Sequence, residues 1–331
     1  MNPGNRRRCG PHGRSAVALA AMLGVGGIGL LAGAGCGNYS NEDLEYLIAL
    51  PQTDDVSMDA PLKAAVPRAD EDEALKMTTA VTKVVNLTAF ELLALVDRIR
   101  SFTPTAREQN GRVWGPFPDD ENPGWRLAFR MTKGTAADGV TPHFDYELVM
   151  IGPAGTDFGT DGPPTPETTV LAGWFERAGQ AGAGVGHLSL TPKAARDAGA
   201  VLPNLERVVS YAFDYDNRSS LRTLDVTALN ERPVDPTKDA ESATYHYERA
   251  PNGDGGMTFT FLQDTVEGPA GVDTLQIASR WRGTGEGRAR ISVLAGDRAG
   301  LTWVDCWAAT SLTSYNELRQ LGDPLTCIPE L

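Results

Sequence analysis

Apolar and polar residues alternate along one segment after another beyond Gly111, and this pattern is typical of strands with one buried face. Clusters of Gly, Pro, Asp and Asn separate the segments, as at Gly152-Pro153 and Asp216-Asn217. Turns this short connect antiparallel strands and cannot connect parallel ones. The pattern therefore predicts an antiparallel meander, with strands at 125–131, 144–151, 170–177, 185–190, 208–214 and 221–229.

Two hairpins are expected in the last third of the chain, where 244–249 pairs with 257–262 and 275–282 with 288–294 across Gly-rich turns. In the second hairpin Leu275, Ile277 and Trp281 share one face. We therefore expect a mainly β fold, in which the meander forms a curved sheet, a half-barrel or a barrel. Five tryptophans are expected to fill its core or, alternatively, to line a lipid or sugar cavity: Trp125, Trp174, Trp281, Trp303 and Trp307.

A different spacing marks residues 70–102, where apolar side chains recur at helical intervals. Asp70 to Glu73 place negative charge in the first turn, which favours a helix there, and Pro104 ends it. One long amino-terminal helix is thus expected within 69–103, packed against the sheet or, alternatively, free to bind a partner. Shorter helices are expected from Asn41, as the cap, to Pro51 and from Thr191 to Gly199.

The amino end differs in composition from the rest of the chain. Arginines at positions 6, 7, 8 and 14 precede residues 16–34, which carry no charge. A basic start followed by an apolar run is typical of a secretory signal, although the run is nearly long enough to span a bilayer. Its many glycines weaken a permanent membrane helix, so cleavage is favoured.

The residues Gly33, Ala34, Gly35 and Cys36 resemble the lipidation signal of bacterial lipoproteins, with Gly33 where that family has Leu. The resemblance implies that residues 1–35 are removed and that Cys36 carries lipid. Gly37 is not the Asp that retains such proteins in the inner membrane, which implies an outer-membrane location, on the periplasmic or surface face. The alternative is a secreted protein without lipid that is cut nearby.

Three parts are therefore expected: a cleaved signal peptide (1–35), a lipidated tether and linker (36–68), and a single β-rich domain (69–331). The chain of 331 residues has a net charge of −13, and loss of the four leader arginines leaves −17 for residues 36–331. So acidic a surface repels nucleic acid, which excludes it as a partner. It indicates a solvated surface or, alternatively, a polycationic partner.

Four cysteines occur in the chain. Cys9 leaves with the leader and Cys36 takes the lipid, so an exported protein retains Cys306 and Cys327. An oxidising compartment favours a disulfide between them, which would fix the carboxyl end to the body. Neither a CxxC pair nor a nearby histidine accompanies them, so no metal site is predicted.

No catalytic motif, cofactor motif or metal-ligand spacing occurs in the chain. His143, His187 and His246 are far apart in sequence and are expected to be isolated, satisfied or solvent-facing histidines and not metal ligands. Carboxylates such as Asp214 and Asp216 would have to be brought together by folding to form an acid–base site. The runs 279–282, 285–289 and 305–307, with Tyr315 and Cys327, resemble uncharacterised surface lipoproteins of the myxobacterial type, which implies no activity.

The expected function is that of a non-enzymatic, lipid-anchored envelope protein that binds an apolar ligand or a partner protein. The predicted helix and meander resemble the half-barrel carriers that move lipids between membranes. The alternatives are an envelope hydrolase with a carboxylate site and a purely structural component. A deep apolar cavity, a cleft with converging carboxylates, or neither would distinguish the three.

Overall fold

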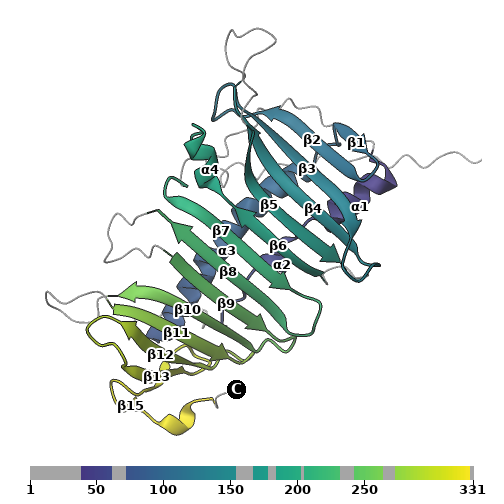
Figure 1. The fold of residues 1–331 in the computed structure, drawn as a ribbon. Coiled ribbons are helices and arrows are strands. Elements are labelled where there is room, and N and C mark those ends of the chain that lie inside the picture. Colours follow the sequence, from purple (N-terminus) through teal and green to yellow (C-terminus); the bar gives the residue numbers. More distant parts are fainter. Residues whose placement is uncertain are drawn as a thin grey trace, which may run out of the picture.

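The computed structural model describes residues 39–61, 72–153, 167–177, 184–202, 205–231, 242–263 and 273–328. Its strands form one antiparallel sheet of 15 strands, in which each strand pairs with the next along the chain (Figure 1). The two edge strands do not pair with each other, so the sheet stays open. The predicted antiparallel meander is confirmed, and the closed barrel that the sequence left possible does not form.

The strands are β1 (Ala106–Glu108), β2 (Gly111–Pro118), β3 (Arg126–Thr135), β4 (Pro142–Ile151), β5 (Glu167–Arg177), β6 (Gly184–Leu190), β7 (Val208–Asp216), β8 (Arg222–Asn230), β9 (Ser242–Arg249), β10 (Gly255–Gln263), β11 (Asp273–Trp281), β12 (Gly287–Ala295), β13 (Thr302–Trp307), β14 (Thr313–Asn316) and β15 (Leu321–Gly322). Both expected hairpins are present, as β9–β10 and β11–β12.

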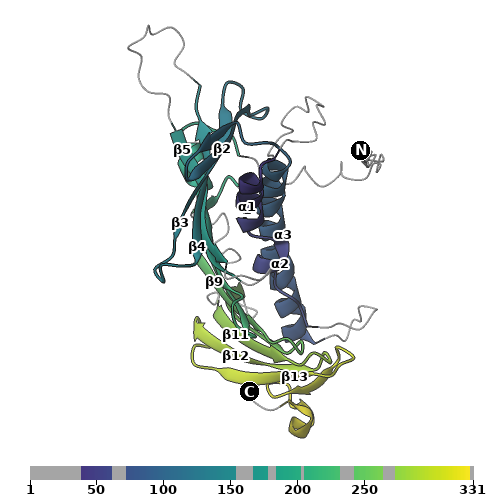
Figure 2. The same ribbon diagram turned by 90° about the vertical axis from the view of Figure 1, so that its right-hand side faces the viewer.

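The helices are α1 (Asn41–Ala49), α2 (Thr53–Val56), α3 (Glu73–Arg100) and α4 (Pro192–Asp197), with a 3-10 turn, η1, at Pro324–Thr326. The 28 residues of α3 lie within the range in which the sequence predicts a helix. Figure 2 shows α1, α2 and α3 along the concave side of the curved sheet. The opposite, convex face is the one seen in Figure 1.

The core fills the space between the concave face and the helices. Along β11 buried and half-buried residues alternate strictly, and Leu275, Ile277 and Trp281 are buried as expected. Gly287 leaves room for the Trp307 ring, which a Cβ at this position would meet. Trp125, Trp281 and Trp307 lie in the core, but Trp174 and Trp303 remain half-buried. The expectation that all five tryptophans fill the core is therefore wrong for these two.

Residues 39–61 belong to the body of the protein, so the expected tether and linker over 36–68 is wrong for this part. Tyr46, Leu50, Val56 and Met58 are buried in the same core as the sheet. The cap of α1 is Ser40, not Asn41: its hydroxyl accepts a hydrogen bond from the Asp43 amide. Because these apolar side chains pack under the sheet, α1 and α2 stabilise the domain.

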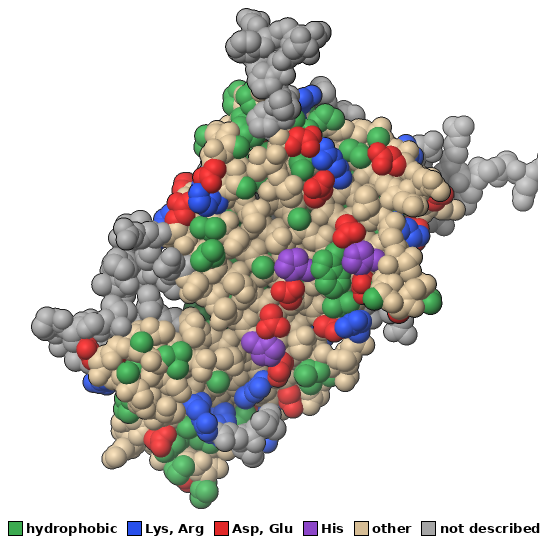
Figure 3. Space-filling view, viewed as in Figure 1, with side chains coloured by type: hydrophobic (Ala, Val, Ile, Leu, Met, Phe, Trp, Pro, Cys, Tyr) green, Lys and Arg blue, Asp and Glu red, His purple; other side chains and the backbone are tan. Residues whose placement is uncertain are grey.

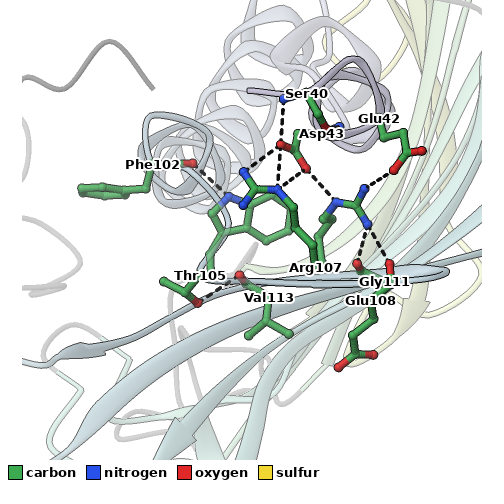
Figure 4. A network of polar contacts seen from close by, with 11 residues as sticks. Ser40, Glu42, Asp43, Phe102, Thr105, Arg107, Glu108, Gly111 and Val113 are labelled. Carbon is green, nitrogen blue, oxygen red and sulfur yellow. Dashed lines mark hydrogen bonds and ion pairs between the residues drawn. The ribbon is translucent and has the colours of Figure 1, made fainter. Parts of the chain in front are cut away.

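Two arginines attach α1 to the first strands through the fully buried Asp43 (Figure 4). Arg107 and Arg112 donate to its carboxylate, with Arg112 Nε 2.7 Å from Oδ1 and Arg107 Nη2 3.0 Å from Oδ2. Burial alone would raise the pKa of Asp43, but the hydrogen bonds from Arg107, Ser40 and Arg112 hold that pKa well below its usual range. Asp43 is therefore charged at every physiological pH.

A disulfide closes the carboxyl end. Cys306 on β13 bonds to Cys327 just after η1, across a sequence separation of 21 residues. The predicted Cys306–Cys327 pairing is confirmed, whereas Cys36 lies outside the described residues. None of the helices in the described ranges has an apolar stretch long enough to span a bilayer.

Candidate functional site

A pocket of about 340 Å³ lies between the first turns of α3 and the strands β11 to β14. Its floor includes Leu275, Ile291 and Val293, and Trp303 forms one wall. Register places these side chains together: Leu275 pairs with Val293 and Ile291 with Trp303, all on the concave face. The pocket is thus an unfilled part of the core that opens at the end of the sheet.

Asp305 occupies an inward position in this apolar wall. It lies on β13 between Trp303 and Trp307, which point to the same side because side chains alternate along a strand. Only 4% of Asp305 is exposed. A carboxyl group in such a place requires a polar partner, because burial of a lone charge is costly.

Asp72 is that partner. It is fully buried just before α3, where its Oδ1 accepts from the Leu75 amide at 3.0 Å and its Oδ2 accepts from the Thr313 hydroxyl at 3.1 Å. Burial, followed by the charge of Asp72 and a hydrogen bond to it, raises the pKa of Asp305 to about 8. The Asp305 carboxyl group therefore holds its proton to a higher pH than an exposed aspartate does.

One carboxyl oxygen of Asp305 makes no hydrogen bond to the described residues. This atom, Oδ1, is buried. Buried polar atoms nearly always have a partner, so this acceptor is an exception; surrounding atoms shield it, and it is not exposed to the pocket.

Two cationic side chains line the same pocket. The hydrogen bonds of Arg298 and Arg319 are made through their main-chain amides, to Asp273 and Asn316. Neither guanidinium has an ion pair within the part of the chain that the structure describes. The acidic lining residue Glu73 is already paired, with Lys76 Nζ 2.9 Å from its Oε1. The exposed lining therefore carries unbalanced positive charge.

The convex face holds a second cluster, formed by the histidines. His187 lies opposite Trp174 and Asp214 in the register, and Asp225 lies opposite Asp214 and His246. Figure 3 shows the three histidines in a band across this face, with acidic side chains between them. Adjacent strands bring together these residues, which the sequence separates. Of the expected possibilities of isolated, satisfied or solvent-facing histidines, the satisfied one is confirmed by their carboxylate partners.

Each histidine of this band hydrogen-bonds to a carboxylate. His143 Nδ1 lies 2.9 Å from Glu176 Oε1, and the His143 ring stacks on Trp174 at 5.6 Å between centroids. His246 Nδ1 lies 2.7 Å from Asp225 Oδ1. Desolvation opposes their charging but is outweighed by these hydrogen bonds, so the pKa values of His143 and His246 are raised.

The two carboxylates that the sequence offered for an acid–base site each have a partner in the convex band. Asp214 is paired with His187 at 2.7 Å and Asp216 with Arg218 at 2.6 Å, all partly exposed. Among the described residues no group of three or more His, Cys, Asp or Glu side chains can hold a metal ion. The band is a solvated, internally neutralised surface.

The sequence does not predict this pocket, because its polar residues are distant from one another along the chain and belong to no motif. One local signal was available: Asp305 is in phase with Trp303 and Trp307, which makes it an acidic residue at a core position. No family model, curated protein or solved structure matches this chain.

Proposed function

We propose that this protein is a non-enzymatic, lipid-anchored envelope protein that binds a small ligand with an apolar part in the pocket between α3 and β11–β14. The observation that carries the proposal is the pocket itself. Its volume of about 340 Å³ lies at the lower end of the range of ligand sites, and it combines an apolar floor with a few polar groups, as such sites do.

The filled concave face favours a small ligand over a membrane lipid. In a half-barrel carrier the ligand occupies the concave side of the sheet. Here side chains such as Tyr46, Val85 and Leu93 from α1 and α3 occupy that place in the core. The pocket lies beside the first turns of α3, where Glu73, Ala74 and Met77 line it.

Ser40, which follows the proposed lipidation site Cys36 by four residues, and the pocket lie at opposite ends of α3. Ser40 already caps the first helix of the body, so only three residues separate it from Cys36. With a rise of 1.5 Å per residue, the 28 residues of α3 span about 40 Å. A short tether at one end would hold the protein close to the outer membrane, with the pocket at the far end.

Filling the pocket is expected to abolish ligand binding. Leu301→Trp places a large side chain at a half-buried pocket position, and Leu294→Trp is the matched control because Leu294 is exposed outside the pocket. The affinity for the neutral fluorescent probe N-phenyl-1-naphthylamine is expected to fall about tenfold or more in the first variant and to stay unchanged in the second. Equal affinity in both variants, or no binding to the wild type, contradicts the proposal.

The anchor requires its own test. Cells that express the wild type or Cys36→Ala are labelled with radioactive palmitate, and label is expected in the wild type alone. Equal incorporation into the two proteins would rule out a lipid on Cys36.

A carboxylate hydrolase is the second candidate, and the Asp72–Asp305 pair beside the pocket is the observation in its favour. Shared protons and raised pKa values are common at acid–base sites. However, both oxygens of Asp72 accept hydrogen bonds from the chain itself. The pair thus ties the start of α3 to β13 and β14, which favours a structural and ligand-binding role.

A further inference from the structure

We infer that the pocket selects amphipathic anions. This inference rests on the proposed ligand-binding function and names the chemistry of the ligand. It combines two features of the pocket: an apolar floor, and two guanidinium groups that have no ion pair among the described residues.

The charge preference comes from Arg298 and Arg319. Several arginines of the described residues are engaged in ion pairs; Arg112, Arg130 and Arg280 are examples. Within the same ranges Arg298 and Arg319 have no ion pair, and a carboxylate or phosphate is the group that guanidinium binds best. Because Lys76 neutralises Glu73, no free acidic side chain on the exposed lining opposes an anion.

The pocket also sets a direction for the pH dependence. Asp305 is faced by Asp72 from the start of α3, by Asn316 from β14 and by the charge of Arg319 after β14, with Glu73 and Arg298 also lining the pocket. When Asp305 loses its proton, a new negative charge appears beside the ligand. Affinity for an anion therefore falls as the pH rises through about 8, while affinity for a neutral analogue does not.

The test is calorimetric titration of the full chain with four matched probes at pH 6.5. These are decanoate, its neutral methyl ester, 3-hydroxydecanoate and decyltrimethylammonium. The two anions are expected to bind about tenfold more tightly than the ester, because charge-assisted hydrogen bonds are the strong ones. The cation is expected to bind least.

Two variants assign these preferences to residues. In the double variant Arg298→Gln/Arg319→Gln decanoate is expected to bind no better than its ester, and Arg282→Gln, an exposed arginine outside the pocket, is the control. In Asp305→Asn, which has no proton to lose, affinity for decanoate is expected to be equal at pH 6.5 and 9.5. The wild type is expected to lose about tenfold over that range.

The possible results distinguish the charge preference of the pocket from its ability to bind a ligand at all. Equal affinity for decanoate and its ester, tightest binding of the cation, or the same pH dependence in Asp305→Asn overturns the inference while the ligand-binding function stands. Failure of all four probes overturns the inference and the proposed function together.

Discussion

Replacing Asp43 with alanine is expected to lower the free energy of unfolding by about 3–5 kcal/mol, because it leaves a buried cation without its partner. Arg112 is only 2% exposed and keeps its contacts with Glu42, Glu108 and Gly111, but its Nε loses the acceptor at 2.7 Å. Arg107 loses the same carboxylate. Because these contacts attach α1 to β1 and β2, α1 is expected to lose its attachment to the sheet in this variant.

Denaturant unfolding of the wild type and Asp43→Ala measures this effect. The matched control is Glu45→Ala on the same helix, because Glu45 pairs with Lys133 at 2.6 Å where both side chains are partly exposed. Pairs of that kind contribute about 0.5 kcal/mol. If the two alanine variants lose equal stability, the Asp43 network does not hold α1 on the sheet.

The parts of the fold that depend on local periodicity could be predicted from the sequence. In β11 every second residue is buried, so the faces of Leu275, Ile277 and Trp281 follow from the sequence alone. The same holds for α3, whose start is marked by acidic residues. The disulfide followed from counting cysteines, because only Cys306 and Cys327 remained to pair.

The role of residues 39–61 could not be predicted in this way. Prolines and a short apolar pattern indicate a linker, yet Leu50 and Val56 are fully buried. What fixes this segment is the contact between Asp43 and Arg112, which lie 69 residues apart. A pairing over such a distance leaves no periodic signal in the sequence.

The pocket and the histidine band depend on register, which local patterns do not specify. Asp72 and Thr313 meet only because β14 returns to the start of α3, 241 residues later. His187 and His246 share one face because β6 to β9 pair in sequence order. A single-residue shift in one strand would move its side chains to the other face.

Removing the disulfide is the second change with a large expected effect. The double variant Cys306→Ala/Cys327→Ala is expected to lower the free energy of unfolding by about 3 kcal/mol, because the bond closes a loop of about 20 residues in the unfolded chain. The loop also contains Asn316 and Arg319, which line the pocket. We therefore expect the variant to bind the ligand less tightly even under conditions in which it remains folded.

Two measurements separate these effects. Denaturant unfolding gives the stability, and titration with N-phenyl-1-naphthylamine well below the unfolding midpoint gives the affinity of the folded form. The control is the wild type with dithiothreitol, which should reproduce both losses, while Glu45→Ala with the reductant should behave as the reduced wild type. Unchanged affinity in a destabilised variant would mean that β14 stays in place without the bond, so that the disulfide stabilises the fold but does not shape the pocket.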